Sequence, residues 1–222
     1  MTVLHLADEG EAADLAAFLS RLLHYDRGAA VRLQAAGTAL AVFGRPPSFE
    51  VLAIRAVRLA KPYENGLDVT LDVTVSAGEL LESVDERGAT AVVPGAVTGP
   101  PWAGVLPPRG GWRPEPGLPA PDALRSLVAA AVAEFRSRTG ELPDERRTRA
   151  ELDRIGRDIW SRTVGGTRLP VRAVHAAQSL GFLRPGAPPA LFSSGAWLRL
   201  RTPYGSVAVR RAGLGALDVS VR

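Results

Sequence analysis

The stretch AWLRLRTPYGSVAVRR, residues 196–211, holds two strand-like runs on either side of the turn residues 202–205 (TPYG): AWLRLR, which alternates apolar and basic side chains, and SVAVRR. This pattern predicts two antiparallel strands joined as a hairpin. Three amphipathic helices are expected before it, at about 121–140, 148–165 and 170–181, each opened by proline or threonine and closed by glycine. The second half of the chain therefore predicts three helices followed by a hairpin, with a short strand at 216–221 to pair with it.

The first half predicts an α+β domain with an antiparallel sheet and two helices on one of its faces. The stretch LDVTLDVTV, residues 67–75, alternates apolar with polar side chains, which is typical of a strand with one wet face. The turn at 62–66 (PYENG) precedes it. The expected order is β-α-β-β-β-β-α-β, with a helix at 9–25, a hairpin of strands 31–35 and 39–43, strands at 51–59 and 67–75, a helix at 76–87 and a strand at 90–97.

Three helix starts carry the same N-terminal signature. A serine, threonine or aspartate is followed three residues later by glutamate at Asp8, Ser76 and Thr148. The short side chain accepts a hydrogen bond from the free N–H at the third helical position. These residues are predicted to cap the helices at 9–25, 76–87 and 148–165.

Residues 99–120 separate the two halves, and nine prolines fall between residues 94 and 121. Neither a helix nor a central strand tolerates that density of proline. Trp102 and Trp112 lie in this segment, so it is either a proline-rich recognition segment with aromatic anchors or a semi-rigid linker whose tryptophans pack on the neighbouring domains. We favour the linker, because a free peptide gains little from two large rings left in water. The chain is thus divided into domains at 1–98 and 121–222.

Charge is distributed unevenly over the 222 residues, whose net charge is +4. Residues 1–98 carry a net charge of −5, residues 99–120 +1 and residues 121–222 +8. The basic residues are 26 arginines and the single Lys61, a bias typical of a GC-rich genome, so the arginine content alone does not indicate a nucleic-acid partner. The opposite signs of the two halves are more informative.

No constellation of residues predicts catalysis. Cysteine is absent, and His5, His24 and His175 are isolated from other metal-ligating residues in the sequence. No phosphate-binding loop or nucleophile elbow is present. We therefore expect a protein that is not an enzyme, with no metal and no cofactor. The N-terminus lacks a basic leader and the longest apolar run, 127–133, is too short to span a bilayer, so a cytoplasmic protein without a membrane partner is expected.

The segment LPVRAVHAAQSLGFLR, residues 169–184, together with the two helices before it and the hairpin after it, resembles the winged-helix form of the helix-turn-helix domain. In that family the third helix enters the major groove and the hairpin contacts the backbone. The resemblance implies DNA or RNA as a partner of the second half. The implied contact residues are Arg168, Arg172, His175, Gln178 and Ser179 at the helix, and Arg199, Arg201, Arg210 and Arg211 on the hairpin.

Four short phrases, FGRPP at 43–47, LPPRGGW at 106–112, IWSR at 159–162 and RLRTPYGS at 199–206, resemble an uncharacterised family of two-domain proteins from high-GC actinobacteria. The sequence as a whole predicts a non-enzymatic nucleic-acid-binding protein whose first half is a regulatory or interaction domain. The alternative is a protein-interaction or assembly module that does not bind nucleic acid. In that case the arginines of the second half form an ordinary solvated surface or face the acidic first half.

Overall fold

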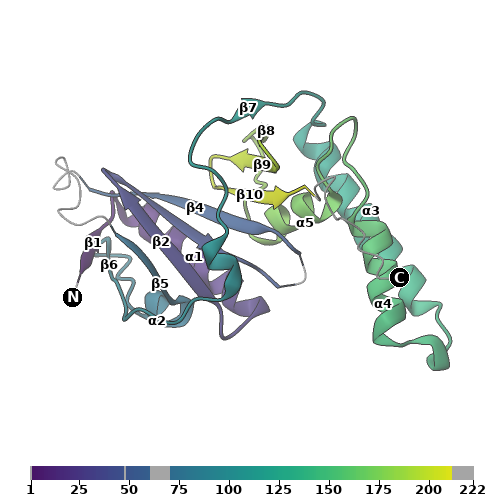
Figure 1. Cartoon of the computed structure of the whole chain (residues 1–222), viewed down its shortest axis with the longest axis horizontal. Coiled ribbons are helices and arrows are strands. Elements are labelled where there is room, and N and C mark those ends of the chain that lie inside the picture. Colours follow the sequence, from purple (N-terminus) through teal and green to yellow (C-terminus); the bar gives the residue numbers. More distant parts are fainter. Residues whose placement is uncertain (1, 48, 61–70, 212–222) are drawn as a thin grey trace, which may run out of the picture.

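The computed structural model describes residues 2–47, 49–60 and 71–211, which hold five α-helices and two antiparallel sheets (Figure 1). The α+β class and the order β-α-β-β-β-β-α-β of the first half are confirmed. The first half contains β1 (Val3–His5), α1 (Glu9–Tyr25), β2 (Ala30–Ala36), β3 (Ala39–Gly44), β4 (Leu52–Arg58), β5 (Asp72–Ser76), α2 (Ala77–Glu82) and β6 (Thr90–Val92). The remainder contains the 3-10 turn η2 (Pro101–Gly104), β7 (Arg113–Pro114), α3 (Pro121–Gly140), η3 (Asp144–Arg146), α4 (Arg149–Trp160), α5 (Val171–Ser179), β8 (Ala190–Ser194), β9 (Trp197–Thr202) and β10 (Gly205–Arg210).

A single eight-stranded sheet runs through both halves in the order β5-β2-β3-β4-β10-β9-β8-β7, while β1 and β6 pair separately. The hairpin β9–β10 continues the first sheet because β10 pairs antiparallel with β4, with Ser206 opposite Ile54 and Ala208 opposite Leu52. Four strands of the large sheet thus come from residues before 77 and four from residues after 112.

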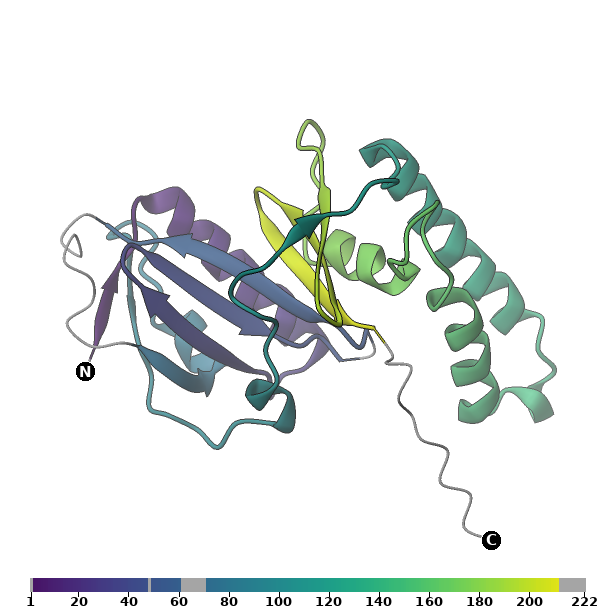
Figure 2. The ribbon, with the colours of Figure 1, turned by 45° about the horizontal axis from the view of Figure 1, so that its top comes forward.

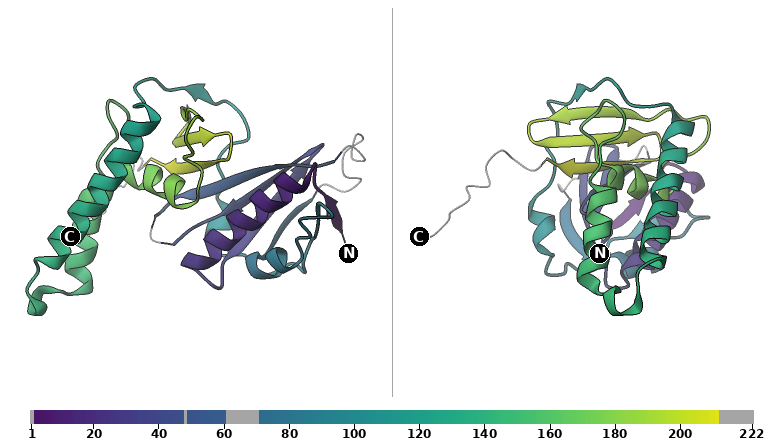
Figure 3. Two further views of the ribbon diagram at one scale, coloured as in Figure 1. Left: turned by 180° about the vertical axis from the view of Figure 1, so that it is seen from behind. Right: turned by 90° about the vertical axis from the view of Figure 1, so that its right-hand side faces the viewer.

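The two faces of this sheet have different coverings. The first face carries side chains such as Leu33, Leu40 and Val207 and is covered by α1, α2 and α5. The second face carries Phe43, Ile54 and Ala208 and is crossed by the segment that leads from η2 to β7 (Figure 2). Helices α3 and α4 pack as an antiparallel pair that extends away from the sheet (Figure 3).

The hydrophobic core under the first face is continuous between the halves. Phe18 of α1 stacks on Phe182, which follows α5, with ring centroids 5.8 Å apart. Gly205 opens β10 with a φ of 154°, and a Cβ at this position would lie 2.5 Å from the Phe182 ring. A glycine is therefore required where the second hairpin meets this shared core.

A buried arginine also joins the halves. Arg55 of β4 is 5% exposed, and its guanidinium donates to the carboxylates of Glu11 at 3.0 Å and Asp14 at 3.2 Å and to the carbonyl of Tyr204 at 2.8 Å. Arg184 donates to Asp14 at 3.0 Å and lies 4.0 Å above the Tyr204 ring. Since Glu11 and Asp14 belong to α1 while Tyr204 and Arg184 belong to the second half, these bonds fix the two halves against each other.

The three N-caps form as predicted. Asp8 accepts from the Glu11 N–H at 2.8 Å, Ser76 from the Glu79 N–H at 3.3 Å, and Thr148 from the Glu151 N–H at 3.3 Å. Helix α1 covers the predicted range 9–25. The Glu11 side chain is bound by arginines, which shows that a capping residue can also take part in a tertiary contact.

Three expected elements are shorter than predicted, and one of them is the helix expected at 148–165, because α4 ends at Trp160. Helix α2 ends at Glu82 because the Ser83 hydroxyl bonds to the carbonyls of Leu80 and Val92, both at 2.8 Å. Strand β6 ends at Val92, two residues before Pro94, which has no N–H to donate. The predicted turn at 62–66, the start of the strand at 67–75 and the strand at 216–221 lie outside the described residues.

Candidate functional site

Helix α5 was expected to present its polar side chains outward, but it is packed on two sides. It lies between the strands β9 and β10 and the helices α3 and α4, as the right-hand view of Figure 3 shows. Five of its nine residues are buried, namely Val171, Ala173, Val174, Ala176 and Ala177. Among its four predicted contact residues only Gln178 is exposed, while Arg172, His175 and Ser179 are half-buried.

His175 belongs to an aromatic cluster. Its ring stacks on Trp160 of α4 with centroids 4.6 Å apart and meets the edge of Phe49 at 5.1 Å. Burial lowers the pKa of His175 below its ordinary value of 6.5, so the imidazole is neutral at pH 7. In this setting the histidine acts as an aromatic side chain with two polar atoms.

The two arginines nearest the start of α5 face carboxylates. Arg168 pairs with Glu115 at 3.3 Å, and Arg172 lies 3.8 Å from Glu50. The Nε atom of Arg172 is hidden from solvent and has no hydrogen-bond partner among the described residues. Glu50 itself has a φ of 52°, a left-handed conformation that costs free energy in a residue with a Cβ and is concentrated at functional sites.

The hairpin arginines lie on the opposite face of the sheet from α5. Arg199 is half-buried, donates to the Ser206 hydroxyl at 2.9 Å and lies 5.7 Å from the Trp112 ring. Desolvation and the neighbouring Arg201 lower its pKa. Arg211 donates to the carbonyl of Gly195. The structure therefore separates Arg199, Arg201 and Arg210 from the predicted contact residues of α5, whereas Arg168 and Arg211 both lie near Glu115.

Arg201 and Arg210 are exposed and have no ion-pair partner in the part of the chain that the structure describes. Arg210 lies directly opposite Trp197 in the pairing of β10 with β9. Arg201 shares the second face with Trp197, four residues further along β9, which places it about 13 Å away at the usual rise of a strand. Two free cations therefore share this face with the Trp197 ring, one directly opposite it and one toward the far end of β9.

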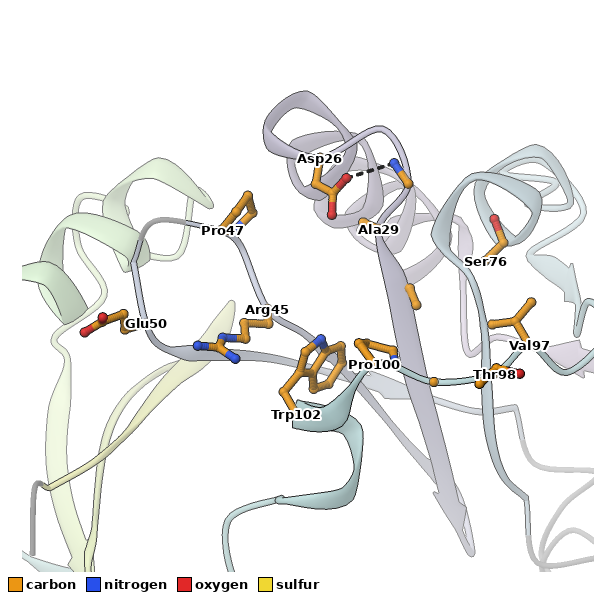
Figure 4. Close-up of a pocket in the computed structure, with 13 residues that line it drawn as sticks. Asp26, Ala29, Arg45, Pro47, Glu50, Ser76, Val97, Thr98, Pro100 and Trp102 are labelled. Atoms are coloured by element: carbon orange, nitrogen blue, oxygen red, sulfur yellow. Dashed lines mark hydrogen bonds between the residues drawn. The ribbon is translucent and has the colours of Figure 1, made fainter. Parts of the chain in front are cut away.

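A hollow runs along the second face on both sides of Trp102, and we call it the sheet groove; Figure 4 shows the part that is lined by Asp26, Ser76 and Trp102. One part, of about 730 Å³, extends toward Asp26 and Ser76. The other, of about 350 Å³, extends toward Trp197 and Arg210. Arg45, from the loop after β3, lines both parts and points between Glu50 and Trp102.

Sequence reasoning did not assign Arg45 or Trp197 to a site. Trp102 packs against Phe43 and Leu52 on the second face. The Trp112 indole donates to the carbonyl of Pro108 at 3.0 Å. Both tryptophans therefore make contacts within the protein. The sequence indicates that Trp197 and Leu198 point to opposite faces of a strand. It does not indicate that β10 pairs with β4, a pairing that places Arg45 near the same surface as Trp197.

The described residues contain no cluster of three or more histidine, aspartate or glutamate side chains arranged to hold a metal ion. The described helices also include none that combines the length and the apolar character needed to span a bilayer. His24 meets the edge of the Tyr25 ring at a centroid distance of 5.3 Å and is part of the aromatic packing at the end of α1.

Two family models match adjacent parts of the chain. Residues 1–104 match a family described as "Domain of unknown function (DUF8010)", and residues 107–214 match one described as "Domain of unknown function (DUF8185)". No curated protein matches this chain. The molecule is thus composed of two adjacent domains of unknown function, consistent with an uncharacterised two-domain family, and its large sheet takes four strands from each match.

Proposed function

We propose that this protein is a non-enzymatic nucleic-acid-binding protein that holds a single strand along the sheet groove and the second face of β9–β10. The observation that supports this proposal is the half-exposed ring of Trp197 with two free cations on the same face, Arg210 directly opposite it and Arg201 about 13 Å away. Single strands are bound by grooves that combine positive charge with aromatic rings on which bases stack.

The groove extends this combination beyond the hairpin. Arg45 and Trp102 repeat the pairing of a cation with an aromatic ring, and Arg45 is exposed. Among the described residues, Glu50 is the one carboxylate that lines the apolar part of the groove, and it lies 3.8 Å from Arg172; Asp26 lines the other part. A phosphate backbone along the groove and the hairpin would therefore meet three arginines, Arg45, Arg201 and Arg210, and two described carboxylates.

This proposal keeps the element order of the winged-helix resemblance and changes the contact surface. Three helices α3, α4 and α5 precede the hairpin β9–β10, which would correspond to the wing. Helix α5 is enclosed by α3, α4 and the sheet, so we assign the contact to the hairpin and not to this helix.

The test is fluorescence anisotropy with a labelled oligothymidylate of about 20 nucleotides at several salt concentrations. Three phosphate contacts predict a log–log slope of about −2 against salt, and replacing both Arg201 and Arg210 by alanine is expected to reduce it to about −0.7. The control is the double variant Arg149→Ala, Arg157→Ala, which removes the same charge from exposed positions of α4.

Absence of binding at about 100 micromolar protein in low salt would contradict nucleic-acid binding, because that is the weak end of non-specific affinity. An equal loss of affinity in the two double variants would show that binding depends on net charge and not on the second face. Tighter binding to a duplex than to the single strand would contradict the stacking mode.

A protein-interaction module is the second candidate. The apolar part of the groove is lined by Leu52, Trp102, Val105 and Trp197, and Val105 is 48% exposed. Exposed apolar side chains beside a polar rim are typical of protein-binding surfaces. A partner whose capture is lost in Val105→Asp but unchanged in the variant lacking Arg201 and Arg210 would favour this function.

A further inference from the structure

A second hollow lies on the helix side of the molecule, between the two halves, and we call it the aromatic cleft. It measures about 440 Å³, within the range of small-molecule sites. Tyr25 and Phe49 line it from the first half. Phe135 of α3, Trp160 of α4 and His175 of α5 line it from the second half.

The rings of the cleft are held by one another. Tyr25 and Phe49 meet edge to face with centroids 5.5 Å apart, and Phe135 and Trp160 lie 6.0 Å apart. His175 bridges the two groups through its contacts with Phe49 and Trp160. Such a wall presents both ring faces and ring edges, which a planar aromatic ligand can contact in stacked and perpendicular arrangements.

The charge of the cleft has one sign. Arg136 and Arg172 line it together with the rings, and no carboxylate among the described residues does. Arg136 is exposed and has no ion-pair partner among the described residues, while the nearest described carboxylate to Arg172 is that of Glu50, at 3.8 Å. One cation without a partner and one with a loosely placed partner therefore line the cleft, which favours an anionic ligand.

We propose that the aromatic cleft binds a small planar aromatic carboxylate, with the ring against Phe49, Trp160 and His175 and the carboxylate on Arg136 and Arg172. A carboxylate matches the planar fork of a guanidinium, which can donate two parallel hydrogen bonds. Glu50 lines the groove and lies 3.8 Å from Arg172, but the rings and the two arginines of the cleft do not line the groove, so this proposal does not depend on the proposed nucleic-acid function.

The experiment is isothermal titration calorimetry of the whole chain with 1-naphthoate, with three comparison compounds. 1-Naphthalenemethanol keeps the rings and removes the charge, cyclohexanecarboxylate keeps the charge and removes the planar ring, and 1-naphthyl phosphate changes the anion. Naphthoate is expected to bind with a Kd of about 10 to 100 micromolar, and both the alcohol and the saturated acid about ten-fold more weakly.

The variants Arg136→Gln and Arg172→Gln are each expected to weaken naphthoate binding about ten-fold. Arg157→Gln, an exposed change on α4 outside the cleft, is the matched control and is expected to leave the Kd unchanged. Because Arg136 is exposed, its variant should fold even if that of Arg172 does not.

A second measurement locates the ligand. The indole N–H signal of Trp160, assigned with Trp160→Phe, is expected to shift on titration while those of Trp112 and Trp197 stay in place. Absence of heat and of shifts at millimolar naphthoate, equal affinity for the neutral alcohol, or equal loss in Arg157→Gln would each overturn the proposal. Tighter binding of the phosphate ester would overturn the choice of a carboxylate.

Discussion

Two arginines of the large sheet, on strands that both pair with β10, have opposite surroundings. Arg55 of β4 points to the first face, is 5% exposed and is bound by two carboxylates and a carbonyl. Arg201 of β9 points to the second face, is exposed and has no ion-pair partner among the described residues. In an arginine-rich chain, the residue type does not reveal the role of a given arginine. That role depends on the face of the strand on which the arginine lies and on the carboxylates near it.

Position in the strand explains why Arg55 needs so many partners. Three of the first four residues of β4 are buried apolar side chains, and Arg55, the fourth, takes a buried position that would ordinarily hold another apolar side chain. A buried guanidinium without partners would cost several kcal/mol. Glu11, Asp14 and the Tyr204 carbonyl offset most of that cost, although the Nε–H of Arg55 has no partner among the described residues.

The largest expected effect is that of Arg55→Ala. Breaking a buried ion pair by removing one partner is expected to lower the free energy of unfolding by about 3 to 5 kcal/mol. Urea unfolding followed by circular dichroism measures this change. Arg58→Ala is the matched control, because Arg58 binds the same Glu11 from a side chain that is 70% exposed, and its effect should be far smaller. Similar losses in the two variants would remove the distinction between buried and exposed arginines.

A smaller effect is expected from the ion-pair network between α3 and α4. Arg162 and Arg138 each contact Glu134 and Asp158, at distances from 2.5 to 3.3 Å. Their guanidinium groups hold the pKa of both carboxyls below the ordinary values of 4.5 and 3.8. The unfolded chain therefore takes up protons at a higher pH, and the stabilisation is present above about pH 4.5 and lost as the pH falls below it.

Arg162→Ala tests that network. The variant is expected to unfold at a slightly lower urea concentration at pH 7, with the difference from the parent shrinking in about 1 M salt, where charges are screened within about 3 Å. The same difference should also shrink between pH 5 and pH 3. A difference that is independent of both salt and pH would show that Arg162 acts through packing of its side chain.

The smallest effect on stability is expected from removing Arg201 and Arg210 together. Neither side chain has an ion-pair partner in the described part of the chain, so the midpoint of urea unfolding should not change beyond experimental error. A clear loss of stability would contradict the view that these arginines are free to bind a ligand. It would also contradict the assignment of the second face to nucleic-acid binding.

Local features of the fold could be predicted from the sequence because they depend on near neighbours. The caps at Asp8, Ser76 and Thr148 and the hairpin around Pro203 involve residues a few positions apart. The pairing of β10 with β4 could not be predicted, since the alternation of a strand does not name its partner.

The same limit applies to the candidate sites. The helical period placed Arg172, His175 and Gln178 opposite the apolar stripe of α5, but a second layer of helices covers most of that side. The opposite charges of the halves were a useful sign, because Arg184 pairs with Asp14 and Arg172 lies beside Glu50. Which arginines remain free depends on contacts between distant segments.

The seam between β4 and β10 has a consequence for synthesis of the chain. Arg55 and Tyr204 are 149 positions apart, and contacts this distant in sequence form late in folding. A ribosome therefore releases β4, with the apolar side chains of Leu52 and Ile54, long before its neighbour exists. Until β10 emerges, the backbone of β4 is an open edge that another nascent chain can pair with. Truncation before residue 205 should thus convert the protein into an aggregating species, even if its first half folds correctly.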